Sequence, residues 1–191
     1  STSRRQRQMC IRDRACIDRT IAQLESLGTS RWVGFSFVWF ALLKIVQRDA
    51  EGAVQALHQF YHAFLSPNGF HLNGDFRKTG LSEFQYRPFT LEANCLSVQA
   101  VNEMLLYSQN GEIEIFPVIP ADWRTCAFRG LRVENGLIVS AELTATGCVT
   151  LRLHAKRAGS WYLKNTNQTL RLEQGERRIC RWTIKPDIQD P

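Results

Sequence analysis

The feature that most constrains the fold is a change of hydrophobic pattern at Asn110-Gly111. Before this dipeptide the apolar residues recur at helical spacing, and after it they alternate with polar residues as in half-buried strands. The chain has 191 residues, which is enough for one domain or two small ones. The sequence therefore predicts an α+β protein, with a helical part over residues 15–110 and a β domain over residues 111–191.

The helical part is expected to hold four helices and one long loop. Gly28 is the predicted stop of the first helix, and Asp49 is the predicted cap of the third. The other expected elements are helices over 16–27, 34–47 and about 94–109, and a loop over 66–91. A loop of that length inside a compact domain is often functional.

The β domain is expected to be an antiparallel sandwich of short strands. Asn135-Gly136 is a strong two-residue hairpin signal between alternating runs. The predicted strands cover a short segment around 113–115 and then residues 127–133, 137–143, 149–154, 161–164, 169–172 and 178–184. Their spacing of about ten residues is typical of a sandwich.

The segment Arg4–Arg14 reads RRQRQMCIRDR and looks like a translated transposase-type sequencing-library adaptor. The adaptor codons CGT CGG CAG CGT CAG ATG TGT ATA AGA GAC encode the residues from Arg4 to Asp13 in order. Such a scar is excluded from fold reasoning. Residues 1–14 are therefore expected to be adaptor-derived and disordered, with the biological sequence starting near Ala15 inside a longer gene. The open alternative is a real basic arm that binds nucleic acid or a membrane surface.

This interpretation changes what the charge and the cysteines indicate. The segment has five arginines and one aspartate, so it accounts for +4 of the formal net charge of +6. We therefore expect no nucleic-acid partner, and no apolar run is long enough for a membrane-spanning helix. The five other cysteines are widely spaced without a CxxC pair. They fit reduced thiols and favour the cytoplasm, with a periplasmic or secreted location left open. The oligomeric state is not indicated.

Six short motifs between Ala15 and Leu143 carry a family resemblance. They are Gly34–Trp39, Arg87–Asn94, Asn102–Leu106, Asn110–Ile113, Phe116–Trp123 and Phe128–Arg132. Together they resemble the C-terminal end of glycoside hydrolase family 95, which contains inverting α-L-fucosidases and some α-L-galactosidases. The resemblance implies the last helices of an (α/α)6 barrel followed by a β-rich domain.

The resemblance implies a fragment of an inverting glycosidase that removes terminal α-L-fucosyl or α-L-galactosyl residues from glycans. The family's general acid and its Arg-His-x-Ser-His segment would fall before Ala15. This polypeptide by itself is therefore expected to be inactive, with an oligosaccharide as the partner of its parent. The open alternative is a non-catalytic glycan-binding or structural β-domain module.

Glu92 is the single catalytic candidate, because it occupies the position of the family's acidic residue that assists the attacking water. Asn94 matches the asparagine of the same motif and is expected to shape the turn into the helix and to contribute to substrate binding. The chain departs from the motif by Glu92 for Asp, Ala93 for Gly and Cys95 for Phe. The alternative for Glu92 is an acid that only favours the dipole of a helix start.

Tyr86 and Arg87, in the long loop beside the motif, are the stronger candidates for substrate contact. His71 in the same loop and Trp39 are further candidates, with a hydrogen-bonded surface histidine and core packing as their alternatives. His58 and His62 lie four residues apart, but no third ligand is evident. The sequence therefore predicts no metal site and no cofactor.

Overall fold

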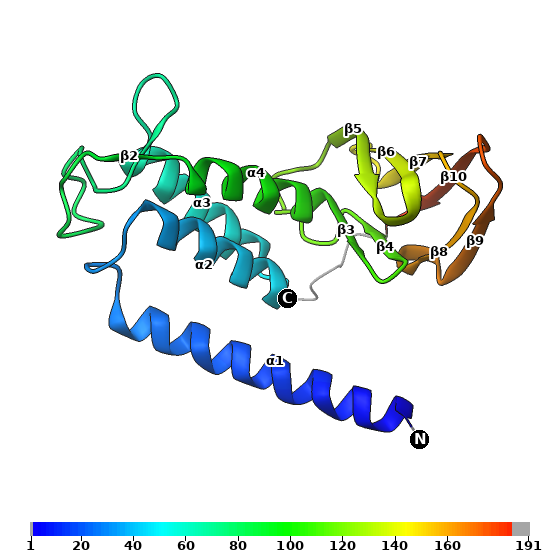
Figure 1. Ribbon diagram of the computed structural model, residues 1–191, viewed down its shortest axis with the longest axis horizontal. Helices are drawn as coiled ribbons and strands as arrows, with labels where there is room; N and C mark the ends of the chain where they lie inside the picture. The colour runs from blue at the N-terminus through cyan, green and yellow to red at the C-terminus, as the bar shows by residue number, and fades with distance from the viewer. Residues whose placement is uncertain (1, 185–191) are drawn as a thin grey trace. The chain divides into compact units, whose positions relative to one another are not determined.

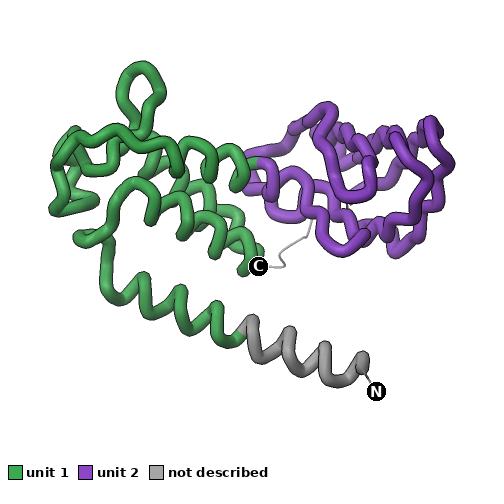
Figure 2. The backbone as a smooth tube through the Cα atoms, viewed as in Figure 1, with its two compact units in different colours: residues 1–101 green, residues 102–191 purple. Residues whose placement is uncertain are grey.

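The computed structural model describes the backbone of residues 2–184 and the side chains of residues 15–184. The prediction that residues 1–14 are disordered lies outside the residues whose side chains are described. The chain divides into two compact units, residues 1–101 and residues 102–191 (Figure 2). The first is mainly helical and the second mainly β, which confirms the α+β class.

The first unit is built from helices and one short hairpin (Figure 1). Its elements are α1 (Thr2–Leu27), α2 (Gly34–Gln47), α3 (Ala50–Phe64), β1 (His71–Leu72), β2 (Phe89–Thr90) and the first part of α4 (Glu92–Leu105). The predicted ends hold at two places. Gly28 follows α1 with a φ of 70°, and the Asp49 carboxylate accepts a hydrogen bond from the N–H of Gly52 at the start of α3.

The core of this unit lies between α2 and α3. Phe37, Phe60 and Phe64 are fully buried there, and the rings of Phe37 and Phe64 are 5.1 Å apart. Small residues such as Ala41 and Ala53 let the two helices approach closely. The helix α1 adds the buried side chain of Ile21, whereas Leu27 at its end is exposed.

The second unit holds two four-stranded sheets. One has the strand order β10-β7-β6-β5 and the other β3-β4-β8-β9. The strands are β3 (Leu106–Gln109), β4 (Glu112–Ile115), β5 (Cys126–Val133), β6 (Leu137–Leu143), β7 (Cys148–Ala155), β8 (Gly159–Leu163), β9 (Gln168–Leu172) and β10 (Arg177–Thr183). All pairings are antiparallel except that of β4 with β8, which is parallel.

Both sheets contribute to one hydrophobic core, as the sandwich prediction requires. Val139 and Leu151 enter it from one sheet, and Ile113 and Leu163 enter it from the other. Trp161 is also buried, and its indole N–H donates to the carbonyl of Glu134 at 3.1 Å, so its one polar atom is satisfied. The alternation of apolar and polar residues in these strands reflects one buried and one outer face.

One predicted boundary is wrong. The sequence predicts a fourth helix over about 94–109, but α4 ends at Leu105 and residues 106–109 form β3. The reason is the turn at Asn110-Gly111, where φ is 53° and 79°. A two-residue turn with both φ values positive makes a hairpin, so the residues before it pair with β4 instead of continuing the helix.

Candidate functional site

The loop between α3 and α4 is closed by the short hairpin of β1 and β2. His71 lies opposite Thr90 in this pair. The backbone pairing continues farther along the loop, where the N–H of Gly74 donates to the carbonyl of Tyr86 at 3.2 Å. The long predicted loop therefore folds back on itself, and backbone pairing joins its two halves directly before α4.

Asn94, in the first turn of α4, ties the helix to this loop. Its side-chain Oδ1 accepts a hydrogen bond from the backbone N–H of His71 at 2.9 Å. Its Nδ2 donates to the carbonyl of Gly69 at 2.8 Å. One amide side chain thus satisfies a donor and an acceptor of the loop backbone at the same time, and it fixes where the loop enters the site.

Glu92 begins α4 and is exposed to solvent. Its Oε2 accepts a hydrogen bond from the backbone N–H of Leu91 at 3.0 Å. An acidic side chain at this position also interacts favourably with the positive end of the helix dipole. The Glu92 carboxylate is therefore fixed by its interactions at the start of α4, and it remains accessible to a ligand.

His71 is buried, with 1% of its surface exposed. Its Nδ1 lies 2.6 Å from the hydroxyl of Thr90, and its Nε2 has no hydrogen-bond partner. Burial lowers the pKa of His71, and the negative charge of Glu92 opposes this shift without cancelling it. The ring is therefore neutral near pH 7. It packs inside the unit, so the predicted contact between His71 and a sugar is not present. Such a contact would require the residues that cover His71 to move.

The backbone of α2 comes close to the same ring. A Cβ atom placed on Gly34 would lie 2.2 Å from the Nε2 of His71 and 3.0 Å from the Cβ of Phe64. Only glycine leaves room for the imidazole here. The first residue of the motif Gly34–Trp39 is therefore required by the packing of a loop residue far along the chain.

The other substrate-binding candidates are exposed. The Tyr86 hydroxyl accepts a hydrogen bond from the side-chain amide of Asn73 at 3.4 Å. The guanidinium of Arg87 lies 5.7 Å from the centre of the Phe76 ring. Trp39 is 42% exposed on α2, so it is not a core residue within this unit. The structure brings His71, Glu92 and Asn94 together, and no contact joins Trp39 to them among the described interactions.

Replacing Asn94 with alanine is expected to release the loop from α4. The variant leaves a backbone donor and a backbone acceptor without partners, so we expect the free energy of unfolding to fall by about 1–3 kcal/mol. Hydrogen exchange of the His71 amide should become faster. Asn94→Asp keeps the acceptor and loses the donor, so its effect on stability should be smaller. Unchanged exchange at His71 in Asn94→Ala would show that the hairpin alone orders the loop.

Asp75, which is not among the residues predicted from the sequence, organises the far end of the loop. Its carboxylate is fully buried and accepts hydrogen bonds from the N–H and hydroxyl of Thr79 and from the N–H groups of Gly80 and Leu81, at 2.9–3.2 Å. Burial would raise its pKa, but these hydrogen bonds outweigh burial and lower the pKa. An aspartate four residues before Thr-Gly is the sequence signal that points to such a turn.

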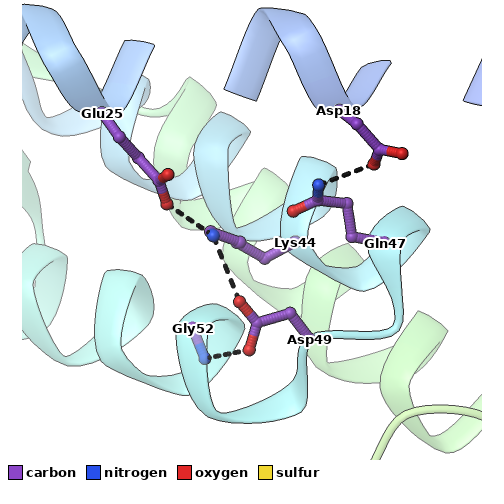
Figure 3. A network of polar contacts seen from close by, with 6 residues as sticks. All are labelled: Asp18, Glu25, Lys44, Gln47, Asp49 and Gly52. Carbon is purple, nitrogen blue, oxygen red and sulfur yellow. Dashed lines mark hydrogen bonds and ion pairs between the residues drawn. The ribbon is translucent and has the colours of Figure 1, made fainter. Parts of the chain in front are cut away.

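A second polar group, also not predicted, lies among α1, α2 and α3. The ammonium of Lys44 is 2.6 Å from Oε1 of Glu25 and 3.1 Å from Oδ2 of Asp49 (Figure 3). Burial favours the neutral amine, but the two carboxylates outweigh it and raise the pKa of Lys44. Nearby, the Gln47 amide donates to Asp18 at 2.7 Å. These contacts join α1 to the α2–α3 pair.

A cavity of about 530 Å³ lies beside this group. Its lining includes the rings of Trp32 and Phe40, the Lys44 ammonium, and the amides of Gln55 and Gln59. The ammonium is already held between two carboxylates, so the charged part of the lining is satisfied within the unit. The group therefore acts as a clamp between helices.

A scan against protein-family models finds no match, and a search of the curated proteins finds no significant match.

Among the side chains of residues 15–184, no group of three or more histidines, cysteines, aspartates or glutamates is placed to hold a metal ion. Within the described part of the chain, no helix has both the length and the apolar character needed to cross a bilayer.

Proposed function

We propose that this chain supplies part of the active site of an inverting glycosidase that removes terminal α-L-fucosyl or α-L-galactosyl residues from glycans. The observation that carries the proposal is the placement of Glu92. Its carboxylate is exposed at the first turn of α4, beside a loop that Asn94 fixes through two hydrogen bonds. Both residues belong to the motif Arg87–Asn94, which resembles that of glycoside hydrolase family 95.

In this proposal Glu92 assists the water that attacks the sugar. Inversion requires a carboxylate on the water side and a carboxylic acid on the leaving-group side, with the two groups about 6.5–9.5 Å apart. The family's Arg-His-x-Ser-His segment has no counterpart in these 191 residues. The chain then holds one half of the pair, and it is inactive by itself.

Tyr86 and Arg87 are the proposed substrate contacts. Both are exposed and lie in the loop that leads to the motif. An aromatic ring can stack on the apolar face of a sugar, and a guanidinium can donate to its hydroxyls. Trp39 remains a proposed contact only for the longer protein, since nothing joins it to Glu92 among the interactions described above.

A second candidate function is a glycan-binding or structural β module without catalysis. The favouring observation is that the strands of the second unit bury a continuous core of their own. In this case Glu92 would serve only to stabilise the start of α4.

The test compares this chain with the longer product of its gene, read upstream through Ala15. With p-nitrophenyl α-L-fucoside, the chain alone should show no hydrolysis above buffer. The longer protein should release β-L-fucose first, as NMR of the fresh product would show. Glu92→Gln in the longer protein should lower kcat by about 10²–10⁴, the usual contribution of an acid–base group.

The matched control is Glu112→Gln, which removes an exposed carboxylate from the edge of β4 and should leave kcat unchanged. A longer protein that hydrolyses the substrate with the same kcat after Glu92→Gln would remove Glu92 from the mechanism. A longer protein without glycosidase activity would leave the β-module interpretation in its place.

A further inference from the structure

The outer face of the sheet β10-β7-β6-β5 carries a group of arginines. Residues alternate between the core and the outside along each strand, and the core side is occupied by apolar residues such as Val139 and Leu151. The outward positions include Arg129 and Arg132 on β5, Arg152 on β7, and Arg177 and Arg181 on β10, all exposed. We call these five residues the basic sheet face.

The strand register brings three of these arginines together. Arg152 pairs with Ile179, which lies midway between Arg177 and Arg181 on β10. Diagonal neighbours of this kind are about 7–8 Å apart at their Cα atoms, within reach of long side chains. Three like charges at such spacing repel one another and are best stabilised by an anion that contacts all of them.

Negative charge on this face is nearly absent. Along the four strands, which are described in full, Glu142 is the one outward-facing carboxylate. It lies 3.8 Å from Arg152, and both side chains are 54% exposed. An exposed ion pair of this length stabilises little, so Glu142 offsets only one of the five charges.

The neighbouring histidine responds to the same positive field. His154 pairs with Arg177 across the strands. Desolvation, followed by the charges of Lys156 and Arg177, lowers the pKa of His154. The two nearby cations act on His154 in the same direction as desolvation, in keeping with the positive charge of this face.

The β-bulge in β5 adds a hollow to the face. The register shifts between Phe128 and Leu131, and the N–H of Gly130 donates to the hydroxyl of Ser140 at 3.0 Å. The hollow beside it has a volume of about 360 Å³, and its charged lining consists of Arg129, Arg152 and the carboxylate of Glu142, which pairs with Arg152. Two guanidinium groups at one depression suit a carboxylate or sulfate, which an arginine fork can hold through two hydrogen bonds.

The surface has the wrong character for nucleic acid. Proteins that hold single strands present aromatic rings on which bases stack, and no outward position of these four strands is a phenylalanine, tyrosine or tryptophan. A duplex admits a helix or a two-stranded ribbon into a major groove about 12 Å wide, whereas three strand spacings already span about 14 Å. The basic sheet face therefore suits a polyanion that is bound through its charged groups alone better than it suits nucleic acid.

We propose that the basic sheet face binds an anionic polysaccharide through its sulfate or carboxylate groups. The inference does not rest on the proposed function, because it uses the second unit only and requires no catalysis. Arg152, Arg177 and Arg181 form the central contact, the hollow at the bulge extends it, and Glu142 weakens it.

Binding of the complete 191-residue chain to immobilised heparin tests the proposal. The triple variant Arg152→Gln, Arg177→Gln and Arg181→Gln should bind at least about tenfold more weakly at roughly physiological salt, where exposed charges more than a Debye length apart are screened. The matched control changes Arg4, Arg5 and Arg7 to Gln, which removes the same charge from the N-terminal segment and should leave binding nearly unchanged. Equal losses in both variants would show a mere net-charge effect and overturn the proposal, as would unchanged binding in the triple variant or no binding at all.

Glu142→Gln keeps the test decisive if the triple variant folds poorly. Removing the one opposing charge should tighten heparin binding roughly two- to fivefold, in keeping with the usual energy of an exposed ion pair, and a misfolded variant would not give a gain. An unchanged or weaker affinity would count against the face.

Other soluble polymers define the chemistry. Dextran sulfate and polygalacturonate should compete with heparin, and neutral dextran should not. Competition by dextran sulfate alone assigns sulfate as the recognised group, and competition by polygalacturonate alone assigns carboxylate. Single-stranded DNA that competes better than heparin at equal charge concentration would overturn the proposal in favour of nucleic acid.

Discussion

Replacing Gly74 with alanine is expected to lower the free energy of unfolding of the first unit by about 2–4 kcal/mol, at the upper end for overpacking of a rigid site. A Cβ atom at this position would lie 2.4 Å from the backbone oxygen of Tyr86 and 2.8 Å from that of Phe84. Both are backbone atoms in the paired arms of the loop, so neither can move away by changing a rotamer. The arms must separate, and the exposed Tyr86 and Arg87 lose their fixed positions.

The matched control for this experiment is Gly80→Ala in the same loop. Gly80 has a φ of 86°, and no atom lies within 4 Å of the place that an alanine methyl group would take. Alanine there adds backbone strain of about 1 kcal/mol without a clash. Urea unfolding and hydrogen exchange of the Asp75 amide give the two readouts. Equal effects of both substitutions would show that the close approach at Gly74 is relieved at little cost.

The second large effect is expected for Asp75→Ala. The substitution leaves four donors without their acceptor inside the loop. Hydrogen bonds to charged groups contribute about 1.5–3 kcal/mol each when removed singly, but the loop can rehydrate, so we expect a total loss of about 2–4 kcal/mol. Asp75→Asn retains one acceptor oxygen and should lose less.

The same residue gives a pH dependence with a definite sign. The pKa of Asp75 is lower in the folded chain than the ordinary value of 3.8. Its contribution to stability is therefore complete above that value and is lost as the pH falls through the lower, folded pKa. In Asp75→Asn this part of the acid-induced loss should vanish, which urea titrations between about pH 2 and pH 6 would measure. An identical pH profile in both proteins would contradict the assignment.

Local signals account for what the sequence predicted well. Asn135-Gly136 supplies two successive positive φ values, 59° and 76°, and the hairpin joins β5 to β6 at the predicted place, although its loop has three residues, Glu134–Gly136, instead of two. Asp49 caps α3 through a contact three residues away. In each case the residues that decide the structure lie within one turn of the chain, so their spacing alone is informative.

Contacts between distant segments account for what the sequence could not predict. The parallel pairing of β4 with β8 brings Ile113 beside Leu163, and no spacing in the sequence encodes that register. The burial of His71 depends on Gly34, which lies in another helix. The sequence could place Glu92 and Asn94 at a loop–helix junction, but it could not show that Asn94 holds the loop backbone from both sides.

The helix α4 runs from Glu92 to Leu105 and so crosses from the first compact unit into the second. Its first turn holds the loop through Asn94, and its last carbonyl groups, those of Met104 and Leu105, accept hydrogen bonds from Val118 and Phe116. A break in the chain between residues 101 and 102 would interrupt this helix. Each unit would then keep only one end of α4, together with the hydrogen bonds of that end. A shortened chain meant to keep the β unit intact should therefore begin before Glu92, so that the whole helix is retained.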